Sequence, residues 1–401
     1  MQSMTSAQPD FQFADRFAQV TGSAIREILK LLNRPGMISF GGGNPASSAL
    51  EEDVVATLAQ QVLAQNGKAI LQYGATEGYA PLKEALCDWL TAFGFQARPD
   101  EVLPITGSTQ GVDLILKALI NPGDVVLVEN PSYLGTLQAL RLYQAEVVPV
   151  ATDEGGIVLD ALETLMRTRR PKLLYVIPTF QNPTGITLAA ERRQPIAEMA
   201  ARYGVVVLED DPYRDLRYAG GALPAIKSYD REGWVAHLSS FSKLISPGLR
   251  CGALTCAPAL LRKAVVGKQS TDVHTSTLTQ AIVAEYLRQG RLPAHVAAIC
   301  KSYGAQMEAM LAHLARFPEG TWYTRPQGGL FLWARLPGGL DAVALLPRAI
   351  ERNVAFVPGT HFFCDGGHQD TLRLNFSNST LAQIDTGMDT LRALVSEAMA
   401  Q

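Results

Sequence analysis

One lysine stands in a sequence context that could support amine chemistry. Lys243 follows two serines, Ser240 and Ser242, directly after a predicted buried strand at 235–239. A lysine in a loop is usually a solvated surface residue. Here, burial and the cation of Arg250 could lower the pKa of the lysine amine, as imine formation requires. The two serine hydroxyls and the Arg250 guanidinium could also bind a phosphate group.

Three further polar motifs open a helix or follow a strand. Residues 106–111 (TGSTQG) open a helical pattern whose free N–H groups could bind an anion, although Ser and Thr are also ordinary helix caps. Residues 182–185 (NPTG) follow a predicted strand at 173–177 and could be only a turn. Residues 209–213 (EDDPY) end another strand, where open α/β sheets bind ligands; two solvated carboxylates in an exposed turn are the alternative.

The elements that must position these motifs alternate as in an α/β domain. Six short runs are rich in Val, Leu and Ile and mostly apolar on both faces, which predicts a sheet covered by helices on both sides. These strands are predicted at 125–129, 146–150, 173–177, 205–209, 235–239 and 252–256. Helical stretches such as 188–203 lie between several of them and indicate βαβ units.

The last third of the chain has a different pattern. Helices over a few antiparallel strands predict a smaller α+β domain there. The predicted elements are a helix at 292–314, a strand at 328–333, a helix at 342–352, strands at 355–357 and 371–376, and a final helix. An early amphipathic helix at 23–32 should pack near the small domain or across the site. We therefore expect an N-terminal arm with this helix (1–45), a large domain (46–289) and a small domain (290–401).

Composition narrows the classes of function. The chain has 401 residues, 47% hydrophobic and 18% charged, and a net charge of −3, which favours a large core and argues against a nucleic-acid surface. The short basic run at 167–172 is best explained as a solvated turn. Five scattered cysteines and six histidines show no metal-ligand or disulfide spacing. No signal peptide or membrane span is evident, so we expect a cytoplasmic protein.

Taken together and in this order, the four motifs resemble those of the fold-type I pyridoxal 5′-phosphate (PLP) aminotransferases of classes I and II. The resemblance extends along nearly the whole chain and is closest to the branch with 2-aminoadipate and kynurenine aminotransferases. Motifs that support this branch are ISFGGGNP (38–45), LQYG (71–74), ENPSY (129–133) and LRLNFS (372–377). The resemblance implies an α/β PLP-transferase fold, with a mostly parallel seven-stranded sheet between helices in the large domain and a smaller α+β C-terminal domain.

The resemblance also implies roles at the cofactor. Lys243 would hold PLP as a Schiff base and then move the proton between the substrate α-carbon and the cofactor. Asp210, three residues before Tyr213 as in the family, would pair with the pyridine nitrogen. Tyr213 and Asn182 would hydrogen-bond the phenolic oxygen, and Tyr133 would stack on the ring, although an ordinary half-buried aromatic is the alternative. The phosphate would be bound by Ser108, Thr109, Ser240, Ser242 and Arg250.

Substrate residues follow from the same resemblance. Arg373 would bind the α-carboxylate by a bidentate pair, although an ordinary salt bridge is the alternative. Asn182 would touch this carboxylate too, and the backbone at Gly41 and Gly42 would line the substrate. Ser23 and Arg26 match a mobile recognition helix that meets the distal carboxylate of 2-aminoadipate. Equally, Ser23 could cap the helix and Arg26 could be solvated.

These roles imply a transaminase that works between an L-amino acid and 2-oxoglutarate by a ping-pong mechanism. The amino acid would be 2-aminoadipate-like, aliphatic or aromatic. Tyr73 would reach the phosphate bound by the partner subunit, which implies a homodimer. A PLP lyase or decarboxylase remains an alternative, because the fold permits these reactions. The ligand-sensing module of a transcription regulator is disfavoured by the acidic charge and by the roughly 20 residues before the first helix.

Overall fold

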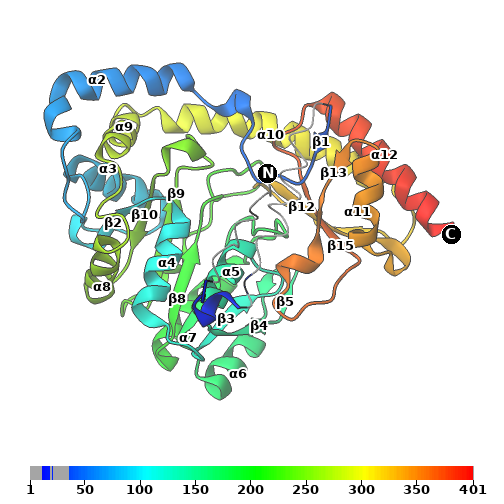
Figure 1. Cartoon of the computed structure of the whole chain (residues 1–401), viewed down its shortest axis with the longest axis horizontal. Helices are drawn as coiled ribbons and strands as arrows, with labels where there is room; N and C mark the ends of the chain where they lie inside the picture. Colours follow the sequence, from blue (N-terminus) through cyan, green and yellow to red (C-terminus); the bar gives the residue numbers. More distant parts are fainter. Residues whose placement is uncertain (1–10, 19, 21–35, 401) are drawn as a thin grey trace, which may run out of the picture.

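The computed structural model describes residues 11–18, 20 and 36–400, and its main element is a seven-stranded sheet (Figure 1). The strand order is β2-β10-β9-β8-β7-β3-β4. Strand β10 runs antiparallel to both of its neighbours, whereas the other strands are parallel to one another. The strands are β2 (Val102–Ile105), β3 (Val125–Glu129), β4 (Glu146–Val150), β7 (Leu173–Val176), β8 (Val206–Asp210), β9 (Val235–Ser240) and β10 (Gly252–Thr255).

Helices cover both faces of this sheet because its strands are apolar on both sides. Along β7, Leu173 belongs to the core that includes α4, and the next residue, Leu174, belongs to the core that includes α6 and α7. This alternation is what the pleat of a fully buried strand produces. The helices of these two layers include α4 (Ser108–Leu119), α5 (Leu134–Leu142), α6 (Leu159–Arg169), α7 (Ala190–Tyr203) and α8 (Pro258–Gln269).

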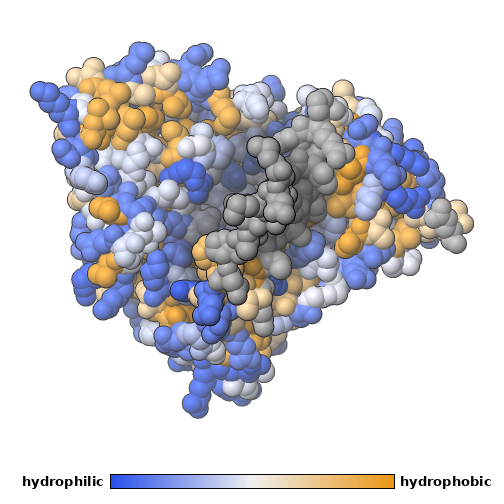
Figure 2. Space-filling view, viewed as in Figure 1, coloured by the Kyte–Doolittle hydropathy of each residue, from blue (hydrophilic) through white to orange (hydrophobic). Residues whose placement is uncertain are grey.

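A second group of helices lies at the β2 side of the sheet. Helix α9 (Thr277–Arg288) packs against α2 (Glu52–Ile70) and α3 (Ala80–Leu90). Figure 2 shows hydrophobic side chains gathered over α2, at the upper left of the face in view. None of the helices described here is long and apolar enough to cross a membrane.

The C-terminal part forms an antiparallel four-stranded sheet in the order β11-β12-β15-β14. Helix α12 packs against α10 and α11 beside this sheet. The early strand β1 (Ile38–Ser39) pairs with β13 (Val354–Ala355), so residues from the start of the chain join this part. The elements are α10 (Leu292–Leu314), β11 (Trp322–Tyr323), β12 (Phe331–Arg335), α11 (Ala342–Glu351), β14 (Val357–Pro358), β15 (Thr371–Asn375) and α12 (Leu381–Met399).

Several predicted boundaries moved for physical reasons, although β3, β4 and α10 match the expected bounds. Strand β8 extends to Asp210 because the ladder to Leu238 of β9 continues there. The strand predicted at 328–333 begins only at Phe331, because the backbone at Gly328 pairs with Arg217 instead and the Gly329 N–H donates to the Leu216 carbonyl oxygen. The strand expected at 355–357 is two strands with different partners, and β2 was not predicted.

Candidate active site

A cavity of about 640 Å³ lies at the carboxyl ends of the parallel strands of the large sheet. Ligands bind at this edge in open α/β sheets. Twelve of the residues singled out from the sequence line it: Gly41, Ser108, Thr109, Tyr133, Asn182, Asp210, Tyr213, Ser240, Ser242, Lys243, Arg250 and Arg373. The motifs are far apart in the sequence; the start of α4, the loop after β7, the ends of β8 and β9 and the middle of β15 bring them together.

Lys243 lies in the turn that follows β9, with its amine in the cavity. Its Nζ donates a hydrogen bond to the Gly43 carbonyl oxygen at 2.8 Å. Burial, followed by the charges of Arg250 and Arg373, lowers the pKa of the Lys243 amine to about 8. About a tenth of this amine is therefore neutral at pH 7, far more than for an ordinary lysine, and the neutral form is the nucleophile and base.

Asp210, at the end of β8, presents a buried carboxylate to the cavity. Its Oδ2 accepts a hydrogen bond from the Tyr175 hydroxyl at 2.8 Å. Its Oδ1 is buried and has no hydrogen-bond partner among the described residues. Burial raises the pKa of this carboxyl group to about 7. A buried acceptor of this kind requires a donor from a bound molecule.

One part of the cavity can bind an anion. Helix α4 starts after Gly107, and as at any helix start the N–H groups of Ser108 and Thr109 have no partner within the helix. A Cβ atom at Gly107 would lie 2.5 Å from the Nη2 atom of Arg250, so only glycine allows this guanidinium to approach. The Ser240 hydroxyl donates to the Ser242 hydroxyl at 3.1 Å, and both also line this cavity.

A second cation reaches the cavity from the C-terminal sheet. The Arg373 guanidinium donates to the Asn182 side-chain oxygen at 2.9 Å and to the Gly41 carbonyl oxygen at 2.7 Å. It also lies 4.3 Å from the ring centre of Phe331 and 5.1 Å from that of Phe362. Burial lowers the pKa of Arg373 to about 10, which still leaves it protonated at neutral pH. The guanidinium is thus fixed and charged.

Two tyrosines complete the lining. The Tyr213 hydroxyl accepts a hydrogen bond from the Asn182 amide nitrogen at 3.5 Å, and the Tyr213 ring packs edge-on against Phe331 with centroids 5.9 Å apart. A Cβ atom at Gly135 would lie 2.7 Å from the Tyr133 ring, so this glycine leaves room for the aromatic face beside the cavity.

The family model for class I and II aminotransferases matches residues 35–391. The chain belongs to the class I and II aminotransferases.

Relatives along the whole length of this aminotransferase agree with that assignment. It is 42% identical to a 2-aminoadipate transaminase of Thermus thermophilus over 95% of this chain and 96% of the relative. It is 37% identical to aromatic-amino-acid aminotransferase 1 of Thermococcus litoralis, over 96% of this chain and 94% of the relative. The structure of the α-aminoadipate aminotransferase LysN from T. thermophilus, complexed with N-(5′-phosphopyridoxyl)-L-leucine, matches with a TM-score of 0.90, 40% identity, and coverage of 97% and 98%.

The protein is therefore a PLP-dependent transaminase of fold type I, and its substrates are amino acids and 2-oxo acids. The expected fold and reaction type are confirmed, and the comparisons do not support the lyase or sensor alternatives. The cavity itself fits this cofactor. It offers a lysine amine of lowered pKa, an unpartnered Asp210 oxygen for a protonated ring nitrogen, and a helix N-terminus beside Arg250 for a phosphate.

Two of the expected site residues that the structure describes, Gly42 and Tyr73, do not line this cavity. Gly42 lies between Gly41 and Gly43, both of which line it, but does not do so itself. Tyr73 is 81% exposed and contacts the His274 ring edge-on at 6.1 Å. Ser23 and Arg26 lie outside the described residues, so their roles remain predictions.

The sequence analysis missed three residues of the aminotransferase site. Tyr175 bonds to Asp210 from the middle of β7, and its signal was one tyrosine inside an otherwise aliphatic strand. Phe331 and Phe362 flank Arg373, but aromatic residues in short late strands and turns are usually core residues. Their contribution depends on contacts between elements that are remote in the sequence.

Proposed function

We propose that this aminotransferase exchanges an amino group between an L-amino acid and 2-oxoglutarate, with Lys243, Asp210 and Tyr213 as catalytic residues. The observation that carries this proposal is the pair of separate guanidinium groups that act on the Lys243 amine. Arg250 lies beside the α4 N-terminus, and Arg373 enters from β15. One cation suits a cofactor phosphate, and the other suits the carboxylate of an amino acid.

PLP supplies an aldehyde that captures the amino group and a ring that withdraws electrons from the substrate α-carbon. The Lys243 amine, once released, takes the proton from that α-carbon, which its pKa near neutrality favours. Asp210 stays ionised beside a protonated ring nitrogen, because an opposite charge favours the carboxylate. Tyr213 and Asn182 donate hydrogen bonds to the phenolic oxygen of the cofactor.

The remaining cofactor contacts are proposed on the same grounds. Tyr133 stacks on the pyridine face, where its ring borders the cavity. The phosphate is held by the free N–H groups of the first turn of α4 and by side chains around them. These side chains are Ser108, Thr109, Ser240, Ser242 and Arg250.

We further propose a homodimer in which Tyr73 reaches the phosphate bound by the partner subunit. Tyr73 and Leu71 are 81% and 72% exposed, which is unusual for large apolar side chains in one short segment. The hydrophobic surface over α2, the helix that ends just before this segment, is a second feature of an interface (Figure 2).

The proposed amino donors are 2-aminoadipate-like, aliphatic and aromatic amino acids, in line with the names of the relatives. Arg373 and Asn182 bind the α-carboxylate, and the backbone around Gly42 borders the substrate. Ser23 and Arg26 read a distal carboxylate; Val20, three residues before Ser23, lines the cavity. Arg26→Ala should raise the KM for dicarboxylic substrates more than the KM for leucine, and an equal rise for both would remove this role.

The decisive experiment is a half-reaction with glutamate alone. The PLP form should shift its absorbance to that of pyridoxamine phosphate and release 2-oxoglutarate. A protein that performs no such half-reaction with any amino acid contradicts the proposed function. A panel of amino donors, with 2-oxoglutarate as the acceptor, then ranks the substrates.

We also propose three structural units: an N-terminal arm (1–45), a large PLP domain (46–289) and a small domain (290–401). The second boundary is supported by the break between α9 and α10, which lies at residues 289–291. A cytoplasmic location is proposed because all five cysteines are free thiols in the described chain.

A further inference from the structure

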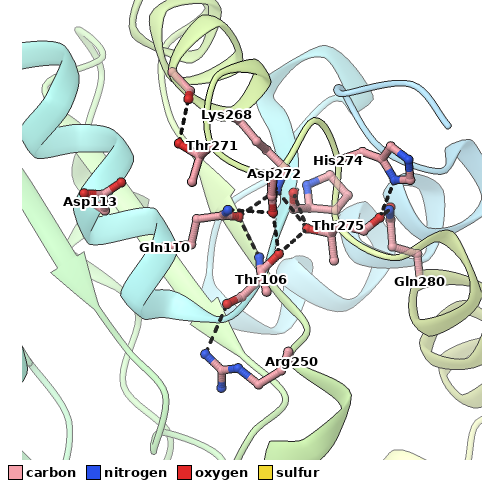
Figure 3. Close-up of polar contacts among 12 residues, drawn as sticks. Thr106, Gln110, Asp113, Arg250, Lys268, Thr271, Asp272, His274, Thr275 and Gln280 are labelled. Atoms are coloured by element: carbon pink, nitrogen blue, oxygen red, sulfur yellow. Dashed lines mark hydrogen bonds and ion pairs between the residues drawn. The ribbon is translucent and has the colours of Figure 1, made fainter. Parts of the chain in front are cut away.

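A buried lysine forms a polar cluster outside the cavity. Lys268, near the end of α8, is 0% exposed. Its Nζ donates to the Gln110 side-chain oxygen at 2.6 Å, to both carboxylate oxygens of Asp272 at 3.0 Å and to the Thr275 hydroxyl at 3.0 Å (Figure 3). With Thr106, these residues make up what we call the Lys268 cluster.

The cluster does not serve the chemistry directly. None of its five members lines the cavity that holds Lys243. Burial lowers the pKa of the Lys268 amine, and the Asp272 carboxylate opposes this shift. A buried charge needs a partner and full hydrogen bonding, which constrains the geometry of every group around it. The cluster is therefore suited to fixing the position of a neighbouring segment.

That segment is the turn before α4. The Thr106 hydroxyl donates to Asp272 at 2.8 Å, and the Thr106 N–H donates to the Gln110 side-chain oxygen at 2.8 Å. Its carbonyl oxygen accepts from Arg250 at 3.1 Å. Every polar atom of Thr106 is thus held. The next residue, Gly107, opens α4, so the cluster fixes both the helix N-terminus and the Arg250 guanidinium.

The other end of the cluster joins the loop that carries Tyr73. The Thr275 carbonyl oxygen contacts His274 Nδ1 at 2.9 Å and accepts from the Gln280 amide at 2.6 Å. The Gly74 N–H donates to His274 Nε2 at 3.1 Å, which makes Nδ1 the protonated ring nitrogen. Tyr73, the residue before Gly74, packs edge-on against this same ring.

We propose that Lys268 and Asp272 are positioning residues for the phosphate group of PLP. They hold the Thr106 turn, and through it the α4 N-terminus and Arg250, in the geometry that binds the phosphate. They also hold the Tyr73 loop, which serves the phosphate bound by the partner subunit. This second part rests on the proposed homodimer; the first part rests on the contacts within one chain.

The test compares PLP with pyridoxal, the same molecule without its phosphate. Holoenzymes of the full chain are stripped with hydroxylamine and titrated with each compound, and binding is followed by the visible absorbance of the lysine-bound form. The variants are Lys268→Met and the milder Thr106→Val, which removes only the hydroxyl that bonds to Asp272. Lys117→Met is the matched control, since Lys117 pairs with Asp113 at 3.2 Å and donates to Thr271 without reaching Thr106.

We expect Lys268→Met to weaken PLP binding about tenfold or more, and Thr106→Val by a smaller factor, because losing a buried hydrogen-bond partner costs that much affinity. Pyridoxal affinity and the control should stay unchanged. An equal loss for both compounds, or no loss for PLP, overturns the proposal; if Lys268→Met does not fold, Thr106→Val decides. No amino donor enters this titration, so its outcome is independent of the glutamate half-reaction.

Discussion

The two faces of the end of β8 carry acidic side chains with different tasks. Asp210 points into the cavity, where Tyr175 bonds to one oxygen and the other oxygen has no partner among the described residues. Its neighbours Glu209 and Asp211 point to the opposite face, as the pleat of a strand requires. Three consecutive acids thus divide between a ligand-binding face and a structural face.

Of the two acids on the structural face, only the Glu209 carboxylate accepts hydrogen bonds from the described residues. Glu209 accepts from the backbone N–H groups of Ile226 at 2.7 Å and Lys227 at 2.8 Å. Asp211 lies 4.0 Å from the Arg214 guanidinium; burial raises the pKa of its carboxyl group, and the charges of Arg214 and Arg193 oppose this shift. Asp210 differs from Asp211 in that its unpartnered oxygen belongs to a residue that lines the cavity, whereas Asp211 does not line it.

His237, on the adjacent strand β9, lies beside Glu209 and Asp211 on the structural face. It is fully buried and packs edge-on against Phe93 and Phe95, each at 5.4 Å. Its side-chain nitrogens, with Glu209 and Asp211, have the separation of metal ligands. Burial, followed by the charge of Arg214, holds the pKa of His237 well below its usual value, so this ring is neutral. Burial alone does not separate these faces; they differ because Asp210 lines the cavity and Glu209, Asp211 and His237 do not.

The largest effect is expected when the Lys243 amine, which faces the cavity, is removed. Lys243→Ala should lose the absorbance of lysine-bound cofactor and reduce turnover by about 10⁴-fold or more, because nucleophile and proton-transfer group are lost together. Circular dichroism should show an intact fold. A variant that retained both absorbance and turnover would show that this lysine has no such role.

Asp210→Asn tests the acid on the same face. A carboxamide cannot ionise beside the ring nitrogen, so kcat should fall by about 10²- to 10³-fold, as for the loss of one preorganised electrostatic contact. Stopped-flow half-reactions and PLP titrations measure this effect. If kcat stayed near the wild-type value, the ring-nitrogen partner would have to be another group.

Asp211→Asn is the matched substitution on the structural face. Arg193 and Arg214 would lose their buried counter-charge, so we expect a decrease in unfolding free energy of about 3 kcal/mol, measured by urea denaturation. Turnover per folded molecule should remain within about threefold of the wild type. A loss of kcat as large as that of Asp210→Asn would end the distinction between the two faces.

The smallest expected effect is the dependence of the rate of cofactor reconstitution on pH. The Lys243 pKa is lowered to about 8, so the neutral amine that attacks the cofactor increases as pH rises and approaches a plateau above that value. The rate of reconstitution with PLP should therefore increase about fivefold from pH 7 to pH 8. Glu209→Gln, on the structural face, should leave this midpoint in place; a shifted midpoint would show coupling between the faces.

Much of this arrangement could be predicted from the sequence. Strand bounds such as Val125–Glu129 followed from aliphatic runs flanked by turn residues. The polar residues at the strand ends predicted a ligand site at one edge of the sheet, where the cavity lies. The partners of those residues could not be predicted. Tyr175 and Lys268 lie inside a strand and a helix, where their residue types indicate nothing about the hydroxyl or amine contacts that the folded chain creates.

The reversed direction of β10 has a consequence for how the cofactor acts on the chain. Because β10 returns antiparallel to β9, Lys243 and Arg250 both lie in the connection at 241–251, between the paired residues Ser240 and Gly252. A molecule bonded to the lysine at its aldehyde end and to the arginine at its phosphate end would link the two ends of this connection to each other. Unfolding these strands would then break the contact between the phosphate and the arginine, and saturation at 100 times the Kd of a ligand that binds only the folded chain would add about 2.7 kcal/mol of stability.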